Sequence, residues 1–561
     1  MDLPALVRGL FAVRNRPFRK LDYKEGDKQE TPHPGRIRRR FIRCSIGWGD
    51  TALRPSRKLL SKLALAAMSL LAAWVTARPA NGDELVAAVR RKFEAYREKL
   101  EELADWCEAE GLSEPAERTR AWLQPVPEDR LLVPILPIKM GGDAPPDDAS
   151  PSVKEWYQKW TALRREQAED LFALARGAVR QGRAGLALDL AVRALHEDPD
   201  HEALRRIFGY QPYAGEWRTR YEVGRLRAGQ IWDDRFGWIP KAQLARFERG
   251  ERPAQPRWIS AEEDARRRRE TNTGWTLDTE HFQVWTDHSL EGAALVGKKL
   301  ETLHELWSRL FVRYYLTEAQ VLSLFDARSR AFAPRPMQHK VVVFRTRAGY
   351  NEALRSQAPQ IEITGGMYLG DRRTAYFFFH DLPEGADLEK ALDVTTVYHE
   401  ATHQLFYELG RVVPTAGRRS NFWVIEGAAM YMETLRREGD FLVLGGIDTP
   451  RMIAARFRRL QDDFYIPLRE FTAMTMDDWQ SDPRIGAIYS QAAGITNFLM
   501  HHEGGKYREV LVQCLSAVYR GTDTPDLLAR LTGRSFTGLD EEYLQYLKAM
   551  PPLPPMRLES R

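Results

Sequence analysis

The sequence predicts an α+β protein in which a small mixed β-sheet is combined with a helical lower subdomain. Apolar or alternating runs at 281–286, 340–344 and 375–379 are typical of strands, whereas the chain after residue 433 mostly shows the apolar spacing of helices. With 561 residues and 43% hydrophobic composition, the chain can bury the cores of two or three units. We expect helical and small β-rich regions to precede the sheet.

Residues 1–58 are strongly basic and show no sustained apolar period. They contain 15 Lys or Arg and 6 Asp or Glu, so we expect disorder, or a start codon placed too far upstream. Residues 1–80 carry 17 basic and 6 acidic side chains while the whole chain carries +5, so the remainder carries −6. The basic character belongs to this segment, and we expect no nucleic-acid partner.

Residues 59–80 have the pattern of a signal peptide. Basic residues precede an uncharged stretch at 63–75, and the small residues Ala77 and Ala80 follow it as cleavage positions. This stretch of 13 residues is short for a membrane span, which needs about 20 residues. We therefore expect export to the periplasm or the outside of the cell. The alternatives are a membrane anchor formed by 59–75, or a buried amphipathic helix.

The next 130 or so residues are predicted to be mainly helical. Residues 83–132 have apolar residues at helical spacing, and 133–153 have the Gly, Pro and Asp content of a linker. Residues 154–209, with a break near Gly182 and Gly185, resemble one tetratricopeptide helix pair. About three such units are needed for a stable solenoid, so we expect this pair to pack on the following domain. The helical region is the expected surface for any protein partner.

Residues 210–275 are rich in Trp, Gly, Arg and Pro, as in Gly215 to Trp217 and Phe236 to Pro240. Short strands and turns are expected, forming a small β module. Interleaved Arg and Trp side chains can stack on nucleic acid bases, but the same residues also form the cores of small β modules. We favour the second interpretation.

The segment His399-Glu400-Ala401-Thr402-His403 is the most informative stretch of the chain. On a helix, His399 and His403 leave the same face one turn apart, so both can bind a single zinc ion. Glu400 would lie at the edge of that face, where it can accept a proton from a water that the metal activates. The neighbouring residues are apolar, and two buried imidazoles need partners.

A third ligand is expected from the helix-like run between residues 421 and 433. Glu426 and Glu433 are seven residues apart and share a helical face among apolar neighbours. Glu426 as a zinc ligand, with Glu433 accepting a hydrogen bond from a ligating histidine, would complete a His₂Glu site with one open position. The alternative is the solvated acidic edge of an amphipathic helix.

The pattern H-E-x-x-H followed by W-x-x-E-G-x-x-x-Y-x-E, at 399–403 and 423–433, resembles the gluzincin zinc metallopeptidases of the MA clan. The aminopeptidase-N-like branch is the most similar. Over roughly 200–548 the chain also resembles large uncharacterised bacterial proteins with a peptidase MA-like domain. The resemblance implies a zincin-like catalytic domain at 276–550 with one zinc on His399, His403 and Glu426, and Glu400 as general base. It also implies that Tyr489 stabilises the oxyanion; a buried structural tyrosine is the alternative.

Two features depart from the aminopeptidase branch. First, 22 residues, 404–425, separate His403 from Glu426, which is more than is usual there. Second, the branch has Gly-x-Met-Glu on the strand before the zinc helix, and its acid holds a free amino terminus; this chain has Tyr368 at that position. Endo- and exopeptidase action therefore both stay open. Because an edge strand of this architecture pairs with extended substrates, Gly366, Met367 and Tyr368 are candidate substrate-binding residues.

Together these features predict an exported zinc-dependent peptidase that hydrolyses peptide or protein substrates. A zinc hydrolase of non-peptide substrates and a non-catalytic scaffold with a structural zinc are the alternatives. Glu400 argues against the scaffold, because a structural site needs no base.

Five other histidines are expected to have no part in the zinc site. His281, His288 and His304 we interpret as structural. His501 and His502 point in different directions on a helix, and we expect them at the surface.

Overall fold

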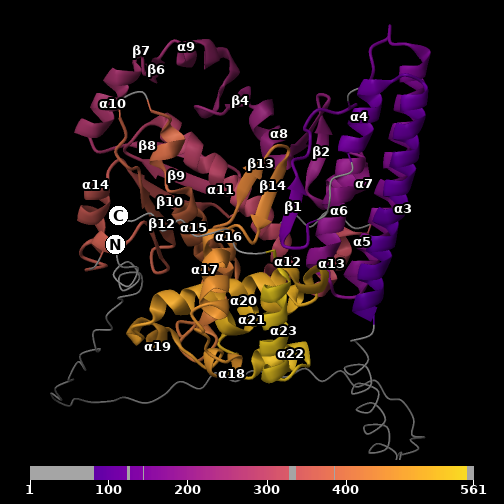
Figure 1. Ribbon diagram of the computed structural model, residues 1–561. Helices are drawn as coiled ribbons and strands as arrows, with labels where there is room; N and C mark the ends of the chain where they lie inside the picture. The colour runs from indigo at the N-terminus through magenta and orange to yellow at the C-terminus, as the bar shows by residue number, and fades with distance from the viewer. Residues whose placement is uncertain are drawn as a thin grey trace, which may run out of the picture. The chain divides into compact units, whose positions relative to one another are not determined.

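The computed structural model describes residues 81–551, apart from 123–126, 143, 327–336, 360 and 384–385. Within these ranges the chain is α+β, with many helices and several small sheets (Figure 1). No helix in the same ranges is both long enough and apolar enough to cross a membrane. The basic segment 1–58 and the signal-like segment 59–80 lie outside the described residues, and what we expect of them stays a prediction.

A five-stranded mixed sheet lies upstream of the H-E-x-x-H segment. Its order is β11-β12-β10-β9-β8; β9, β10 and β12 are parallel, and each outer strand is antiparallel to its neighbour. Three of these strands lie within one residue of their predicted bounds. The strands are β8 (Trp275–Asp278), β9 (Phe282–Thr286), β10 (His339–Phe344), β11 (Met367–Leu369) and β12 (Thr374–Phe378).

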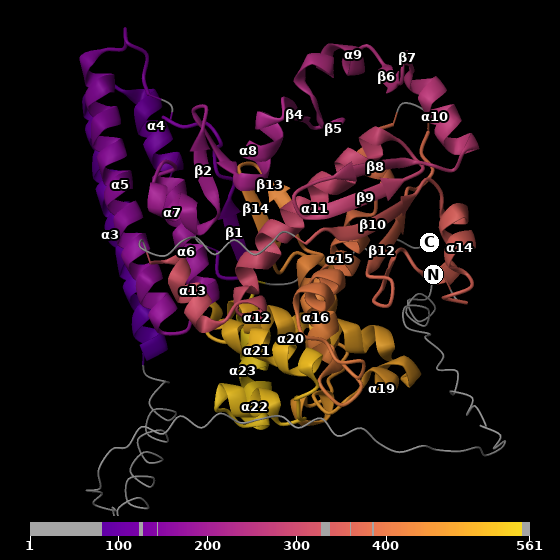
Figure 2. The ribbon, with the colours of Figure 1, turned by 180° about the vertical axis from the view of Figure 1, so that it is seen from behind.

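Alternating residues of the sheet pack against helices on its two faces. Val341 and Val343 of β10 join the core that contains α11 (Leu290–Leu310) and α15 (Val394–Leu409). Val342 and Phe344 join a separate cluster with α14 (Arg347–Leu354). Figure 2 shows α11 along β8 and β9. Helix α11 begins as the sequence indicated, because the Ser289 hydroxyl accepts the amide N–H of Gly292 at 3.0 Å.

The chain after α15 is mostly helical and forms the lower subdomain. Helix α16 packs against α15 on one side and against α20 on the other, so it joins this subdomain to the sheet. Helices α12 (Val312–Tyr315) and α13 (Glu318–Leu324) precede β10. The later helices are α16 (Phe422–Met432), α17 (Pro450–Leu460), α18 (Leu468–Phe471), α19 (Met476–Ser481), α20 (Ile485–Gly505), α21 (Arg508–Arg520), α22 (Leu527–Thr532) and α23 (Phe536–Ala549).

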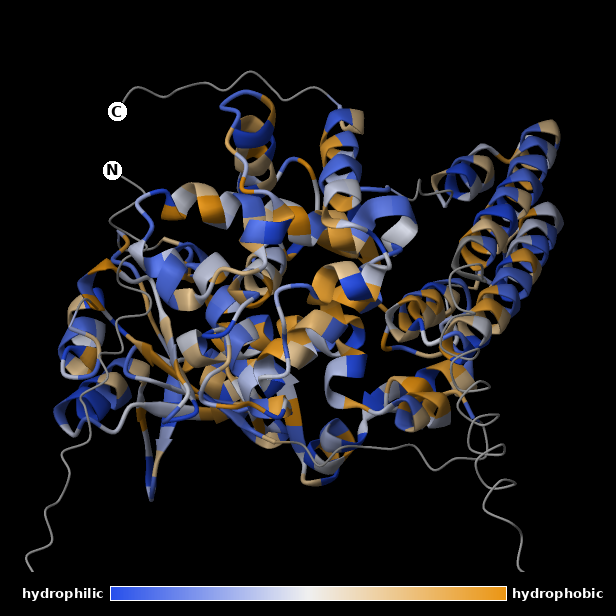
Figure 3. Ribbon diagram, turned by 90° about the horizontal axis from the view of Figure 1, so that it is seen from below, coloured by the Kyte–Doolittle hydropathy of each residue, from blue (hydrophilic) through white to orange (hydrophobic). Residues whose placement is uncertain are grey.

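The amino-terminal part contains α3 (Asn81–Ala109), α4 (Ser113–Ala121), α5 (Pro151–Arg180), α6 (Ala184–Glu197) and α7 (Glu202–Ile207). In Figure 3 the long helices α3 and α5 carry both hydrophilic and hydrophobic residues along their length. The break between α5 and α6 falls at Gly182, whose φ of 76° suits glycine. Helix α6 packs on the later domain, as expected of a single pair: Arg508 forms a partly buried ion pair with Asp189, and the Gly185 amide donates to Glu509 at 2.8 Å.

Residues 210–270 form three consecutive hairpins, each followed by a short helix. The sequence indicated the strands and turns but not the helices. A glycine with positive φ precedes each hairpin, at Gly209, Gly229 and Gly250. The elements are β2 (Tyr210–Tyr213), β3 (Glu216–Thr219) and α8 (Arg220–Arg227); β4 (Gln230–Asp233), β5 (Gly237–Pro240) and α9 (Leu244–Glu248); and β6 (Glu251–Ala254), β7 (Arg257–Ser260) and α10 (Ala261–Glu270).

The structure corrects two expectations. Residues 130–134, predicted to be divided between the helical region and the linker, form strand β1 (Arg130–Pro134). This strand pairs with β14 (Phe441–Gly445), which also pairs with β13 (Arg436–Glu438). A partner about 300 residues away leaves no local signal. His501 is buried and not at the surface: its Nε2 lies 3.0 Å from the Tyr431 hydroxyl. An apolar helix can bury a histidine that finds one polar partner.

Candidate metal centre

Helix α15 carries both histidines of the H-E-x-x-H segment. Asp393 caps its start: one carboxylate oxygen accepts the Thr396 amide at 3.2 Å and the other accepts the Thr396 hydroxyl at 2.7 Å. The helix then places His399 and His403 one turn apart, and their Nε2 atoms lie 3.0 Å from each other. The two imidazoles therefore point at a common position.

Helix α16 brings Glu426 to the same position. It begins after Asn421, whose φ of 53° is left-handed and whose side-chain amide donates to the Ser420 hydroxyl at 2.9 Å and to the Thr524 carbonyl at 2.9 Å. Gly427 sets how closely α16 approaches α20, because a Cβ at this residue would overlap the Thr496 hydroxyl. The glycine beside the acid is thus required by packing.

The carboxylate of Glu426 is the strongest indication of a bound cation. Its side chain is 0% exposed, and neither oxygen has a hydrogen-bond partner. The oxygens lie 3.6 Å from Nε2 of His399 and 3.7 Å from Nε2 of His403. An ionised carboxylate without partners is costly to bury. Neighbouring ligand atoms of a tetrahedral zinc with bonds of about 2.0–2.1 Å lie about 3.3 Å apart, so the three side chains fit a zinc ion.

Glu433 and Arg451 hold the first histidine. Nδ1 of His399 lies 2.6 Å from a Glu433 oxygen, and Arg451 contacts both oxygens of that carboxylate, at 3.0 and 3.1 Å. Burial opposes ionisation of Glu433, but Arg451 and His399 outweigh it and lower its pKa. Burial likewise lowers the pKa of His399, yet Glu426 and Glu433 raise it to about 10. His403 has no such carboxylate on its other nitrogen, and burial lowers its pKa to about 4.

Glu400 lies beside the edge strand of the sheet. It is buried, and one carboxylate oxygen accepts the main-chain N–H of Tyr368 at 2.9 Å. Burial raises the pKa of this carboxyl group, which makes it a stronger base when ionised. Tyr489 comes from α20 and interacts with Glu426; burial first, and then this carboxylate, raise the pKa of its hydroxyl well above the ordinary value. Such a phenol stays protonated and can donate a hydrogen bond.

The three predicted substrate-binding residues have different environments. Gly366 is buried where a Cβ would lie 2.8 Å from Thr396 and 2.9 Å from Phe377, so close packing explains the glycine. The Met367 side chain packs in the cluster on the α14 side of the sheet. The predicted role of these residues was main-chain pairing with a substrate, and it stays a prediction. Tyr368 is half-buried and lies next to Glu400.

Sequence reasoning missed two groups that support the centre. Arg451 follows Glu433 by 18 residues in a different helix, and no local pattern links them. Glu408, at the end of α15, accepts from Gln404 at 3.0 Å and Tyr368 at 3.3 Å, and lies 2.9 Å from Nδ1 of His339. The available sequence signal was an acidic residue, Glu408, within an apolar run that follows the two histidines on the same helix. Both groups depend on contacts between distant segments.

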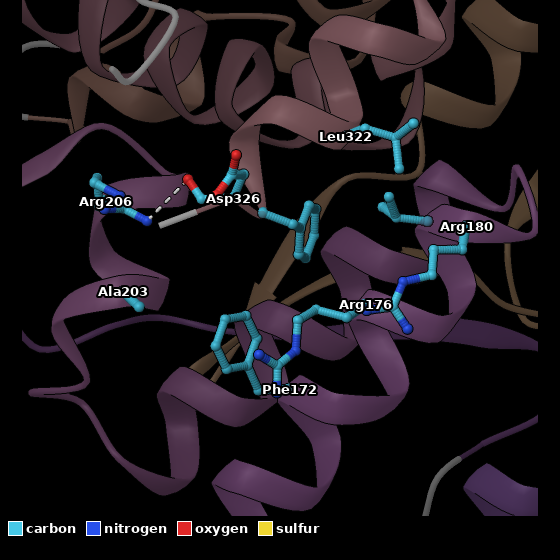
Figure 4. A pocket seen from close by; sticks show the side chains of 9 residues that line it. Phe172, Arg176, Arg180, Ala203, Arg206, Leu322 and Asp326 are labelled. Carbon is cyan, nitrogen blue, oxygen red and sulfur yellow. Dashed lines mark hydrogen bonds between the residues drawn. The ribbon is translucent and has the colours of Figure 1, made fainter. Parts of the chain in front are cut away.

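A separate pocket of about 430 Å³ lies between α5, α7 and α13 (Figure 4). Phe172 and Leu322 provide apolar walls, and Arg176 lies over the Phe172 ring at 4.5 Å. Arg206 donates to the Asp326 carbonyl at 3.4 Å. This pocket belongs to the helical region on which we expected any protein partner, and that expectation stays a prediction.

A family model described as a protein of unknown function, DUF1570, matches residues 393–518. The matched region begins at the capping residue of α15 and contains His399, Glu400, His403, Glu426 and Tyr489. Glu433 and Arg451 also lie inside it. No curated protein and no solved structure matches the chain.

Proposed function

We propose that the chain is a zinc-dependent peptidase of the gluzincin type. His399, His403 and Glu426 would hold one zinc ion, and Glu400 would act as general base. The observation that carries this proposal is the Glu426 carboxylate, which is fully buried without hydrogen-bond partners and faces two imidazole nitrogens. A base 2.9 Å from the main chain of an edge strand adds the catalytic element that a structural zinc site does not need.

A zinc ion at this position would supply a Lewis acid that polarises a carbonyl group and lowers the pKa of water towards about 7. The residues of the chain have separate tasks. Glu400 accepts the proton of the attacking water and returns it to the leaving amine, and its raised pKa suits both transfers. Glu433, held by Arg451, fixes the ring orientation of His399.

Tyr489 and β11 would act on the substrate. A tyrosine hydroxyl that stays protonated can donate to the oxygen that becomes negative, a contact worth about 3 to 4 kcal/mol in the transition state. Strand β11 ends the sheet, and the Tyr368 N–H points to Glu400 rather than to β12. The outer edge of β11 therefore faces the base, where an extended peptide can pair with it.

Glu400→Gln tests the proposal, because it removes the base and retains the size and most contacts of the side chain. The wild type should cleave members of a peptide library and contain one zinc per chain by mass spectrometry. Glu400→Gln should keep the zinc and lose at least about 100-fold in rate. Glu389→Gln, an acid-to-amide change on an exposed residue paired with Lys299, serves as the control.

Other outcomes distinguish the alternatives. A zinc-containing Glu400→Gln variant with full activity contradicts the base assignment. Zinc with hydrolysis of non-peptide carbonyl compounds alone indicates a different hydrolase. Zinc without any hydrolysis, in the wild type and the variant alike, indicates a scaffold.

We also propose export, from the signal-like residues 59–80. In an expressing cell, fractionation followed by amino-terminal sequencing should recover a chain that begins near residue 81 outside the cytoplasm. A full-length chain in the membrane fraction indicates the anchor instead.

A further inference from the structure

A second group of two histidines and a glutamate lies on the other long helix of the sheet domain. Glu301 and His304 are three residues apart on α11, so they share a face of that helix. His281 directly precedes β9. One donor atom from each of the three side chains lies within 4.8 Å of the other two. Among the described residues, this group and the one around Glu426 meet that criterion.

The three side chains are held in place from several directions. A carboxylate oxygen of Glu301 accepts the main-chain N–H of His281 at 2.7 Å, and the other lies 2.7 Å from Nδ1 of the same residue. The rings of His281 and His304 stack with centroids 3.7 Å apart and planes 17° apart. Backbone contacts and stacking therefore restrict the rotamers, which lowers the ordering cost of binding.

The surroundings favour a cation that enters from solvent. The His281 and Glu301 side chains are 28% and 27% exposed, so the cluster is reachable. Glu280 lies next to it and is held by the Thr219 hydroxyl at 2.8 Å. The Glu280 carboxylate thus places a second acidic side chain beside His281.

We propose that His281, Glu301 and His304 form a second site for a divalent transition metal ion. Two imidazole nitrogens and one carboxylate oxygen select zinc, nickel, cobalt or copper over calcium and magnesium, which prefer oxygen ligands. The ion replaces the hydrogen bond between Nδ1 of His281 and Glu301, so it competes with an existing contact. Binding is therefore weaker and more exchangeable than at the buried cluster. The ion links the start of β9 to α11. This position is next to the hydrogen bond between Thr219 of the hairpin region and Glu280.

Equilibrium dialysis of the full chain against buffered free zinc, with metal counted by mass spectrometry, tests this proposal. The wild type should bind zinc in two steps, one at low and one at high free zinc. His304→Ala should lose the high-concentration step and keep the other, whereas His403→Ala should show the reverse. The titration of the wild type thus tests the two sites separately. If the step at low free zinc is missing, the proposed function is contradicted. If the step at high free zinc is missing, this inference is contradicted.

Two controls address folding and non-specific binding. Glu301→Gln retains the size of the side chain and should also lose the second step while the thermal unfolding curve stays cooperative. His201→Ala removes another histidine near a glutamate, Glu169 at 3.2 Å, and should leave both steps intact.

Copper(II) bound to the His403→Ala variant offers an independent readout of the ligands. Its electron paramagnetic resonance spectrum should show two coupled nitrogens, and the further change His304→Ala should abolish that two-nitrogen signal. A second zinc equivalent that persists in both His304→Ala and Glu301→Gln overturns the proposal.

Discussion

Two clusters with the same side chains lie on the two long helices that cover one face of the sheet. In each, a carboxylate lies close to Nδ1 of a histidine: Glu433 is 2.6 Å from His399, and Glu301 is 2.7 Å from His281. In the α15 cluster a further acid, Glu426, is fully buried and faces both imidazoles, 3.6 Å from His399 and 3.7 Å from His403. In the α11 cluster Glu301 serves both as the partner of His281 and as a candidate ligand.

The two clusters differ in how much the folded state would gain from a bound metal ion. At the α15 cluster, the protein has removed the Glu426 carboxylate from water and placed it 3.6 and 3.7 Å from two imidazole nitrogens, so a cation between the three side chains would compensate the buried charge. At the α11 cluster both oxygens of Glu301 already have a partner in His281, so the arrangement does not need a metal ion. The same residue types therefore predict a tightly held ion in one place and an exchangeable ion in the other.

The largest expected effect is the loss of stability when metal is removed from the α15 cluster. A ligand present at a thousand times its dissociation constant stabilises the native state by about 4 kcal/mol. Chelation should lower the melting temperature of the wild type and of His304→Ala alike, and should leave His403→Ala almost unchanged. Calorimetry with and without chelator measures this. If the wild type melts at the same temperature with and without chelator, the α15 cluster holds no stabilising metal ion and does not differ from the α11 cluster in this respect.

Gly427→Ala should disturb the buried cluster through packing. The added methyl group overlaps the Thr496 hydroxyl, so α16 must shift at a cost of about 1–3 kcal/mol, and Glu426 moves with it. Zinc affinity and melting temperature should both fall. The Thr496 hydroxyl has no hydrogen-bond partner, so adding Thr496→Ala should restore both quantities. A double variant no better than Gly427→Ala contradicts this account of the helix contact.

Glu433→Ala should weaken zinc binding at the α15 cluster by about 10–100-fold, because it frees the ring of His399. Arg451→Ala should have a smaller effect in the same direction, since it leaves Glu433 in place. Competition with a fluorescent chelator measures both affinities. The second zinc step should be unaffected in either variant, and a change in that step would mean that the clusters are coupled.

The smallest effect concerns His501, a buried histidine whose hydrogen-bond partner is Tyr431 rather than a carboxylate. Burial lowers its pKa to about 3, whereas the unfolded chain titrates near about 6.5. The unfolded state therefore binds the proton first. The contribution of neutral, buried His501 to the free energy of unfolding is therefore complete above about pH 6.5. It is lost as the pH falls towards 3, by about 1.4 kcal/mol per pH unit.

His501→Gln should flatten that part of the stability profile. Urea unfolding of the wild type and the variant at pH 7 and pH 5.5 gives the difference. If the free energy of unfolding falls by the same amount between pH 7 and pH 5.5 in both proteins, the assignment of this pH dependence to His501 is contradicted.

The sequence predicted the elements with local signals and missed those set by distant contacts. His399 and His403 follow from a spacing of four on a helix, and the cap at Ser289 follows from its position before an apolar period. Strand β1 was missed because β14 lies about 300 residues away. Arg451 was missed for the same reason. The spacing of Glu301 and His304 was visible, but the stacking with His281 arises only in the folded sheet.

The contact between Tyr368 and Glu400 uses the main chain, and this has a consequence for how the protein can diversify. Because the main-chain N–H of residue 368 is what contacts Glu400, nineteen of the twenty amino acids can supply the same donor at this position; proline is the exception. The position of Glu400 therefore does not depend on the side chain at 368, whose hydroxyl donates to Glu408 at 3.3 Å instead. If Glu400 is the base that we propose, variation at residue 368 can change the surface beside it and leave the main-chain contact in place.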